Sequence, residues 1–177
     1  MKTGTRKTAA TGILAALAIT AFALESLFPT VVPGARLGIS NAFVLFAAVY
    51  LGYGYAFTVL VVKATVGSLL TGNIFAITYS LPAGLISLAI EILLLRHAER
   101  FGLPAVSATG AVINATLQNL TFCLITGQAE YFVYAPYLTL IGAVGGVIVG
   151  LAVYFSVKRL PPLGGSDDII NNREDKN

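Results

Sequence analysis

The stretch YLTLIGAVGGVIVGLAVYFSVKR, residues 137–159, is one long apolar run that ends in two basic residues. A helix needs about 20 apolar residues to cross the roughly 30 Å hydrocarbon layer of a bilayer. The run from Tyr137 to Val157 has that length, and Lys158 and Arg159 are typical of the cytoplasmic end of such a span. The stretch therefore predicts a transmembrane helix.

The composition extends this interpretation to the whole chain of 177 residues, of which 56% are hydrophobic and 11% are charged. Soluble domains carry about 25% charged residues, so this chain could not cover a water-facing surface. The net charge of +3 comes mainly from residues at the ends of apolar runs, which predicts orientation in a membrane and no nucleic-acid partner. We expect an all-α integral membrane protein in contact with the lipid bilayer.

Six apolar runs are candidates for membrane spans and predict a six-transmembrane-helix bundle over residues 1–159. The spans are expected at residues 8–28, 37–52, 55–70, 77–95, 105–126 and 137–157. The second and third spans are short, and the sequence GYGY at 52–55 predicts a tight turn between them, with one long apolar helix as the alternative. The tail at 160–177 is polar and contains Pro and Gly, so we expect it to be disordered and cytoplasmic.

The basic residues provide an independent test of the number of spans. With six spans, the basic residues that flank them fall on one side of the membrane: Lys2, Arg6, Lys7, Arg96, Arg100, Lys158 and Arg159. The opposite loops contain only Arg36. Because basic loops are retained in the cytoplasm, both termini are expected there.

Two of the expected spans carry small residues at every fourth position, a spacing that lets helices approach closely in lipid. The stripes are Gly142, Gly146 and Gly150 in the sixth span, and Thr8, Gly12, Ala16 and Thr20 in the first. Packing inside the bundle is one interpretation of each stripe. Docking of another membrane subunit is the other.

Polar side chains within the spans predict a binding site, because such groups are costly in lipid unless they face a cavity or a partner. Asn114 and Gln118 lie four residues apart and share one face of the fifth span, where hydrogen bonding between helices is the alternative. We expect a substrate site in the outer half of the bundle, formed by Glu25, Arg36, Asn41, Asn73, Tyr79, Asn114 and Gln118.

Two ionisable residues lie deeper in the spans. Lys63 is about eight residues into the third span, and Glu91 is about four residues from the inner end of the fourth. A Lys63–Glu91 pair, or a Lys63 side chain that extends toward the inner surface, is the structural interpretation. The alternative is that Lys63 meets an anionic ligand.

Signals for catalysis are absent from the sequence, which predicts that the protein is not an enzyme. There is no P-loop, no GxSxG sequence and no zinc motif. Cys123 and His97 are the only residues of their kinds, so no metal or cofactor site is expected. Asp167 and Asp168 lack the second acidic cluster that a diphosphate–Mg²⁺ site requires.

The sequence PGARLGISN, residues 33–41, resembles the Pro-Gly-x-Lys-Leu-Gly-x-Ala-Asn signature of a bacterial membrane family. That family is the Gx transporter family, also called heptaprenyl diphosphate synthase component I. Further matches are LES (24–26), GSLLTGN (67–73), YSLPAGLISL (79–88) and GAVINATLQ (110–118), so the resemblance covers about residues 8–157.

The chain departs from the family pattern at four positions. Arg36 replaces a lysine and keeps its charge, and Ser40 replaces an alanine. Lys63 stands where an arginine is usual. Ile113 replaces a histidine, which argues against a proton-linked role at that position and indicates a different ligand.

The family is similar to the substrate-binding S components of energy-coupling factor transporters, which capture vitamins or related small molecules at the outer face. The resemblance implies a small-molecule-binding subunit in the bacterial cytoplasmic membrane, with a transmembrane scaffold subunit and two cytoplasmic ATPases as partners. It assigns Thr8, Gly12 and Ala16 to the scaffold interface. The alternative is a non-catalytic accessory protein of a prenyl-quinone or membrane redox pathway.

Overall fold

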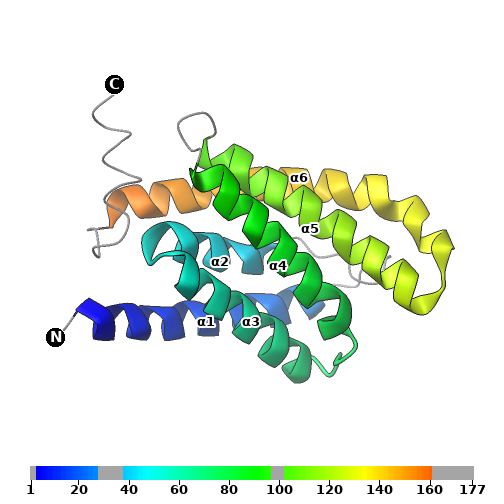
Figure 1. The fold of residues 1–177 in the computed structure, drawn as a ribbon, viewed down its shortest axis with the longest axis horizontal. Coiled ribbons are helices and arrows are strands. Elements are labelled where there is room, and N and C mark those ends of the chain that lie inside the picture. The colour runs from blue at the N-terminus through cyan, green and yellow to red at the C-terminus, as the bar shows by residue number, and fades with distance from the viewer. Residues whose placement is uncertain (1–2, 28–37, 97–101, 161–177) are drawn as a thin grey trace.

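The computed structural model describes residues 3–27, 38–96 and 102–160, and every element in these ranges is a helix. In chain order the elements are α1 (Thr3–Leu27), α2 (Ile39–Tyr50), α3 (Tyr53–Leu70), α4 (Ala76–Arg96), α5 (Leu103–Thr126), the 3-10 helix η1 (Ala129–Tyr134) and α6 (Ala135–Arg159). Consecutive α-helices run in opposite directions along the long axis of the molecule (Figure 1). The expected all-α bundle of six helices is confirmed.

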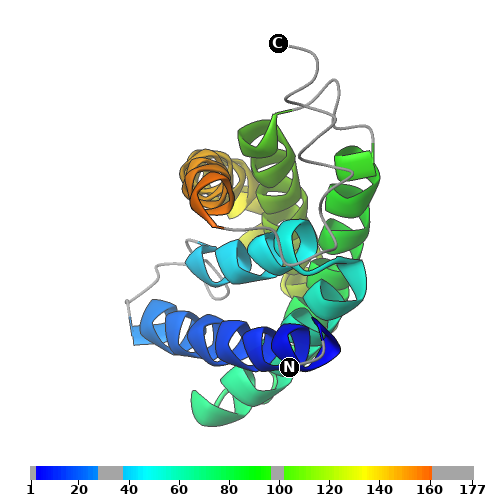
Figure 2. The same cartoon turned by 90° about the vertical axis from the view of Figure 1, so that its left-hand side faces the viewer.

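The helices are arranged around α2, which lies between α1 and α6 when the bundle is viewed from one end (Figure 2). Helix α5 packs along both α4 and α6, whereas α1 packs along α2 and α3. Helix α2 also packs on α3. A helix satisfies its own backbone hydrogen bonds, which is the condition for placing a chain in lipid.

Five of the helices, α1, α3, α4, α5 and α6, are long and apolar enough to cross a membrane. Helix α2 is shorter than the span expected at 37–52, because it has only 12 residues. Its length of about 18 Å covers part of a hydrocarbon layer of roughly 30 Å. The predicted turn before α3 is confirmed, and Gly52 in this turn has a φ of 116°, a conformation that favours glycine.

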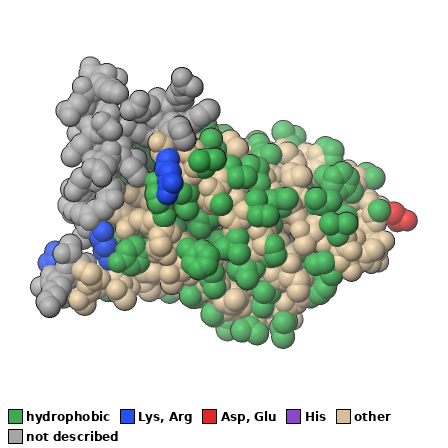
Figure 3. Space-filling model, viewed as in Figure 1, with side chains coloured by type: hydrophobic (Ala, Val, Ile, Leu, Met, Phe, Trp, Pro, Cys, Tyr) green, Lys and Arg blue, Asp and Glu red, His purple; other side chains and the backbone are tan. Residues whose placement is uncertain are grey.

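Charged side chains gather at the two ends of the bundle. Arg6 and Lys7 lie in the first turns of α1, Arg96 in the last turn of α4, and Lys158 and Arg159 in the last turn of α6. Glu130 lies in η1, at the far end of α5. Figure 3 shows this separation on one face, with many hydrophobic side chains between the ends. We refer to these ends as the basic end and the opposite end.

The glycine stripe of α6 lies against α5. A methyl group added to Gly146 would be 2.7 Å from Cα of Ala108, and one added to Gly150 would be 2.5 Å from Cα of Pro104. These glycines therefore allow the two backbones to approach closely, as small residues do in membrane helix pairs. For this stripe, the interpretation as packing inside the bundle is confirmed.

Candidate functional site

A group of polar side chains joins α1, α2 and α3 at the point where α2 begins. It consists of Glu25 from α1, Ser40 and Asn41 from α2, and Lys63 from α3. Glu25 and Lys63 are each only 4% exposed, and Ser40 is 3% exposed. We call these four residues the polar cluster.

The carboxylate of Glu25 caps the N-terminus of α2. Its Oε1 accepts a hydrogen bond from the backbone N–H of Ile39, and its Oε2 accepts one from Ser40 Oγ at 3.0 Å. The first N–H groups of a helix have no partner within the helix, and a negative charge is favourable beside them. Gly38, which precedes the helix, has a φ of 78°. Glu25 thus fastens the end of α1 to the start of α2.

Lys63 binds the same turn of α2 from the other side. Its Nζ donates to Oδ1 of Asn41 and, over 3.5 Å, to Oγ of Ser40. The Ser40 hydroxyl therefore lies between the ammonium of Lys63 and the carboxylate of Glu25. An ammonium within a membrane bundle is costly unless polar groups surround it, and the α2 side chains supply those groups.

The expected relation between Lys63 and Glu91 is electrostatic in this structure. Glu91 in α4 is buried, and the positive charge of Lys63 acts on its carboxyl. The hydrogen bonds of Lys63 described above go to α2 and not to α4. Lys63 therefore connects the polar cluster with a second acidic residue deeper in the bundle.

Asn114 and Gln118 lie on the face of α5 between its contacts with two neighbouring helices. Gly110 contacts α4, whereas Ala111 and Ala115 contact α6. Because residues four apart share one helix face, Asn114 and Gln118 follow Gly110 along the side that faces into the bundle. Oδ1 of Asn114 is buried and has no hydrogen-bond partner among the described residues. A ligand N–H or O–H group would satisfy this acceptor, which is otherwise costly to bury.

Asn73 and Tyr79 make structural contacts at the opposite end. Oδ1 of Asn73 accepts a hydrogen bond of 3.1 Å from the backbone N–H of Ala76 and so caps α4. The buried ring of Tyr79 packs edge-on against Phe75 and Phe122, with ring centroids 6.0 and 5.8 Å away. The contact between Tyr79 and Phe122 joins α4 to α5, and the role of Asn73 and Tyr79 in ligand binding stays a prediction.

The structure brings together only part of the site predicted from the sequence. Glu25 and Asn41 belong to one cluster, whereas Arg36 lies outside the described residues. Sequence reasoning did not include Ser40 or Lys63 among the site residues. Both depart from the family pattern, and Lys63 also stands out as an ionisable residue within an apolar span.

The small-residue stripe of α1 faces outward. Thr8, Gly12, Ala16 and Thr20 are all exposed, and nothing lies within 4 Å of a methyl group built on Gly12. The other face of α1 is buried, with Ala18 and Phe22 in contact with the rest of the bundle. This stripe therefore leaves room for another helix, in contrast to the stripe of α6.

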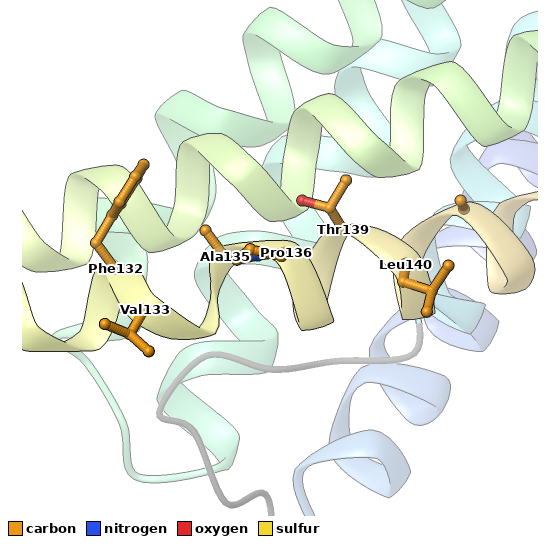
Figure 4. A pocket seen from close by; sticks show the side chains of 7 residues that line it. Phe132, Val133, Ala135, Pro136, Thr139 and Leu140 are labelled. Carbon is orange, nitrogen blue, oxygen red and sulfur yellow. The ribbon is translucent and has the colours of Figure 1, made fainter.

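A separate apolar pocket of about 660 Å³ lies along η1 and the first turns of α6 (Figure 4). Its lining consists of Phe132, Val133, Ala135, Pro136, Thr139, Leu140 and Ala143. Oγ1 of Thr139 is 3.3 Å from Oγ1 of Thr116 in α5. No member of the polar cluster lines this pocket, so its chemistry differs from that of the candidate site.

Side chains that could ligate a metal ion are dispersed over the described helices. Within residues 3–27, 38–96 and 102–160, no three His, Cys, Asp or Glu side chains lie close enough to hold a metal ion. The polar cluster offers an ammonium, a carboxylate, a hydroxyl and an amide. These groups can donate and accept hydrogen bonds.

Comparison with known proteins gives one family. No curated protein and no solved structure matches the chain. The family model described as heptaprenyl diphosphate synthase component I matches residues 14–155, a range that includes the polar cluster, Asn114 and Gln118. This match extends over most of the six helices, and the chain therefore belongs to the heptaprenyl diphosphate synthase component I family.

Proposed function

We propose that this protein is the substrate-binding membrane subunit of an uptake transporter for a small polar molecule. The observation that carries the proposal is the polar cluster, in which buried Glu25 and Lys63 meet at the first turn of α2. Ionisable groups are rare within membrane helices and typically line ligand or ion sites. A helix that begins inside a bundle also resembles the interrupted helices at which transporters bind solutes.

The ligand would lie between the start of α2 and the inward face of α5. Asn41 and Lys63 would contact it from one side, and the unpaired Oδ1 of Asn114 would accept a hydrogen bond from it on the other. Gln118, one turn further along α5, would add a second amide. Arg36, which lies outside the described residues, stays a predicted member of this site.

The proposed orientation places the basic end in the cytoplasm and the opposite end outside, following the rule for basic residues. The cell membrane of a bacterium is the proposed location. Because the sequence contains no nucleotide-binding motif, partner ATPases would supply the energy. The exposed stripe at Thr8, Gly12 and Ala16 would contact a transmembrane scaffold subunit.

A thermal-stability screen of the purified protein tests this proposal. A ligand that binds only the folded state raises its stability, by about 2.7 kcal/mol at 100 times the dissociation constant. Vitamins, flavins and isoprenoid precursors are the probes, and we expect one of these classes to raise Tm. No shift with any of the three classes would contradict the proposal.

Variants of the protein connect such a shift to the proposed site. Asn114→Ala and Lys63→Met should abolish the shift caused by the ligand. Thr58→Val changes an exposed position of α3 and should preserve it. An undiminished shift in both site variants would place the ligand elsewhere in the molecule.

The family description is the basis for a second candidate function, that of a non-catalytic accessory protein of a prenyl-quinone or membrane redox pathway. Copurification from native membranes separates the two. A scaffold subunit with ATPases would support uptake, whereas a prenyl diphosphate synthase or a redox subunit would support the accessory role.

A further inference from the structure

Glu91 is a buried acidic residue that does not belong to the polar cluster. It lies in the half of α4 nearer the basic end and is 8% exposed. Its carboxyl rests directly on α5, because a methyl group added to Gly110 would lie 1.9 Å from Oε1 and 2.5 Å from Cδ. The carboxyl therefore occupies a space between α4 and α5 that exists because residue 110 is glycine.

The polar groups beside Glu91 are directed to other acceptors. Ser87, one turn earlier on α4, donates its hydroxyl proton to the backbone oxygen of Gly110 at 2.7 Å. Lys63 acts on the Glu91 carboxyl by its charge, and it donates hydrogen bonds to Asn41 and Ser40 on α2. The Glu91 carboxyl thus packs closely against Gly110 of α5 and is influenced by the charge of Lys63.

The charged and titratable groups on the surrounding helices are few. They are Tyr50 of α2, Tyr53, Tyr55 and Lys63 of α3, Tyr79 and Arg96 of α4 and Cys123 of α5. Arg96 lies at the basic end with its guanidinium 5.7 Å from the ring centre of Tyr53. Cys123 is 13 residues beyond Gly110, about 20 Å along α5. Among the described residues, Lys63 is therefore the cation that acts on Glu91.

An ionised Glu91 would leave the buried charges of the bundle unbalanced. The acidic and basic side chains buried in the described ranges are two carboxyls and one amine: Glu25, Glu91 and Lys63. Ser40 connects the amine to Glu25 by hydrogen bonds. A carboxylate at Glu91 would be a second negative charge for one positive charge. Burial of such an unbalanced charge is so costly that the group becomes neutral instead.

We propose that Glu91 is a proton-binding site, whose carboxyl carries a proton while Lys63 is held by Asn41 and Ser40. A neutral carboxyl fits beside Cα of Gly110 without a counter-ion. Release of the proton to water leaves a carboxylate that attracts Lys63 toward α4 and away from α2. The proton and the arrangement of the polar cluster are then linked, and such a linkage acts equally in both directions.

Infrared spectroscopy of the full-length protein in lipid nanodiscs tests this proposal without any ligand. The wild-type protein should show the C=O stretch of a protonated carboxylic acid at neutral pH. Glu91→Gln, which keeps the shape of the neutral acid, should remove this band. Glu130→Gln, at an exposed position, should retain it.

Two results would overturn the assignment. One is a wild-type spectrum with no acid band at neutral pH, which decides the question whether or not the variants fold. The other is a band that survives in Glu91→Gln. Replacement of sodium by choline should leave the band unchanged, and a band that depends on sodium would indicate a metal-cation site instead.

A separate measurement tests the proposed link between the proton on Glu91 and the polar cluster. In Lys63→Met the acid band should persist to higher pH than in the wild type, because removal of a nearby positive charge disfavours the carboxylate. An unchanged pH dependence of the band would disprove the link. This outcome is independent of the ligand screen, so the proton site and the proposed uptake function can fail separately.

Discussion

Glu25 performs at the start of α2 the role that an N-cap side chain usually performs from within its own helix. It accepts the backbone N–H of Ile39 although the two residues are 14 positions apart. A cap from another helix adds a tertiary constraint, since α1 and α2 must keep their relative position for the hydrogen bond to form. Lys63 adds the third helix by binding Asn41.

Removal of the Glu25 carboxylate should therefore destabilise the bundle. We expect Glu25→Ala to lower the free energy of unfolding by about 1–3 kcal/mol, because the Ile39 N–H and the Ser40 hydroxyl lose a buried partner. Unfolding in mixed detergent micelles measures this loss. Ser26→Ala, at the neighbouring exposed position, should cost less.

A double variant tests whether the charges act together. Glu25→Ala combined with Lys63→Met should cost less than the sum of the single changes, since no buried charge then remains unbalanced in the cluster. Additive losses would contradict the electrostatic part of this account.

The sequence predicts which polar residues belong to the site better than it predicts which residues they hydrogen-bond with. Glu25, Asn41 and Asn114 were identified because polar groups stand out in apolar runs. That Lys63 hydrogen-bonds with α2 could not be predicted, because this partnership depends on how far α2 and α3 are shifted along each other. Periodicity gives the face of a helix but not this shift.

At the scale of elements, hydropathy alone does not predict the length of α2. The apolar run at 37–52 has nearly the length of a short span, yet the helix lies between Gly38 and Gly52, whose φ values are 78° and 116°. Positive φ values interrupt a right-handed helix, so the glycines shorten α2 to 12 residues. The first turn of α2 thereby comes within reach of Glu25 and Lys63.

The two small-residue stripes should respond differently to one extra methyl group. Gly146→Ala should destabilise the bundle by about 1–3 kcal/mol, because the new carbon meets the α5 backbone 2.7 Å away. Gly12→Ala meets open space and should be neutral or stabilising by up to about 1 kcal/mol, since alanine favours helix. Equal losses in the two variants, measured by unfolding in detergent, would contradict this distinction.

At the scale of the whole molecule, charge and hydropathy together predicted the architecture. Alternation of helix direction places both described termini of the helical region, at Thr3 and Arg159, at the basic end (Figure 1). The buried polar residues could be counted from the sequence, but their separation into a cluster near α2 and a carboxyl near α5 required the three-dimensional packing. This separation is why the proposed solute site and the proposed proton site are distinct.

The orientation of the bundle in the membrane can be measured with single cysteines in a Cys123→Ala background. Cys123 is buried, so its removal leaves the surface unchanged. Glu130→Cys, at the opposite end, should react with a membrane-impermeant maleimide added to intact cells. Lys158→Cys should react only after the membrane is permeabilised, because basic helix ends are retained in the cytoplasm. The reverse labelling pattern would turn the polar cluster toward the cytoplasm, and a subunit oriented in that way could not capture solutes from outside.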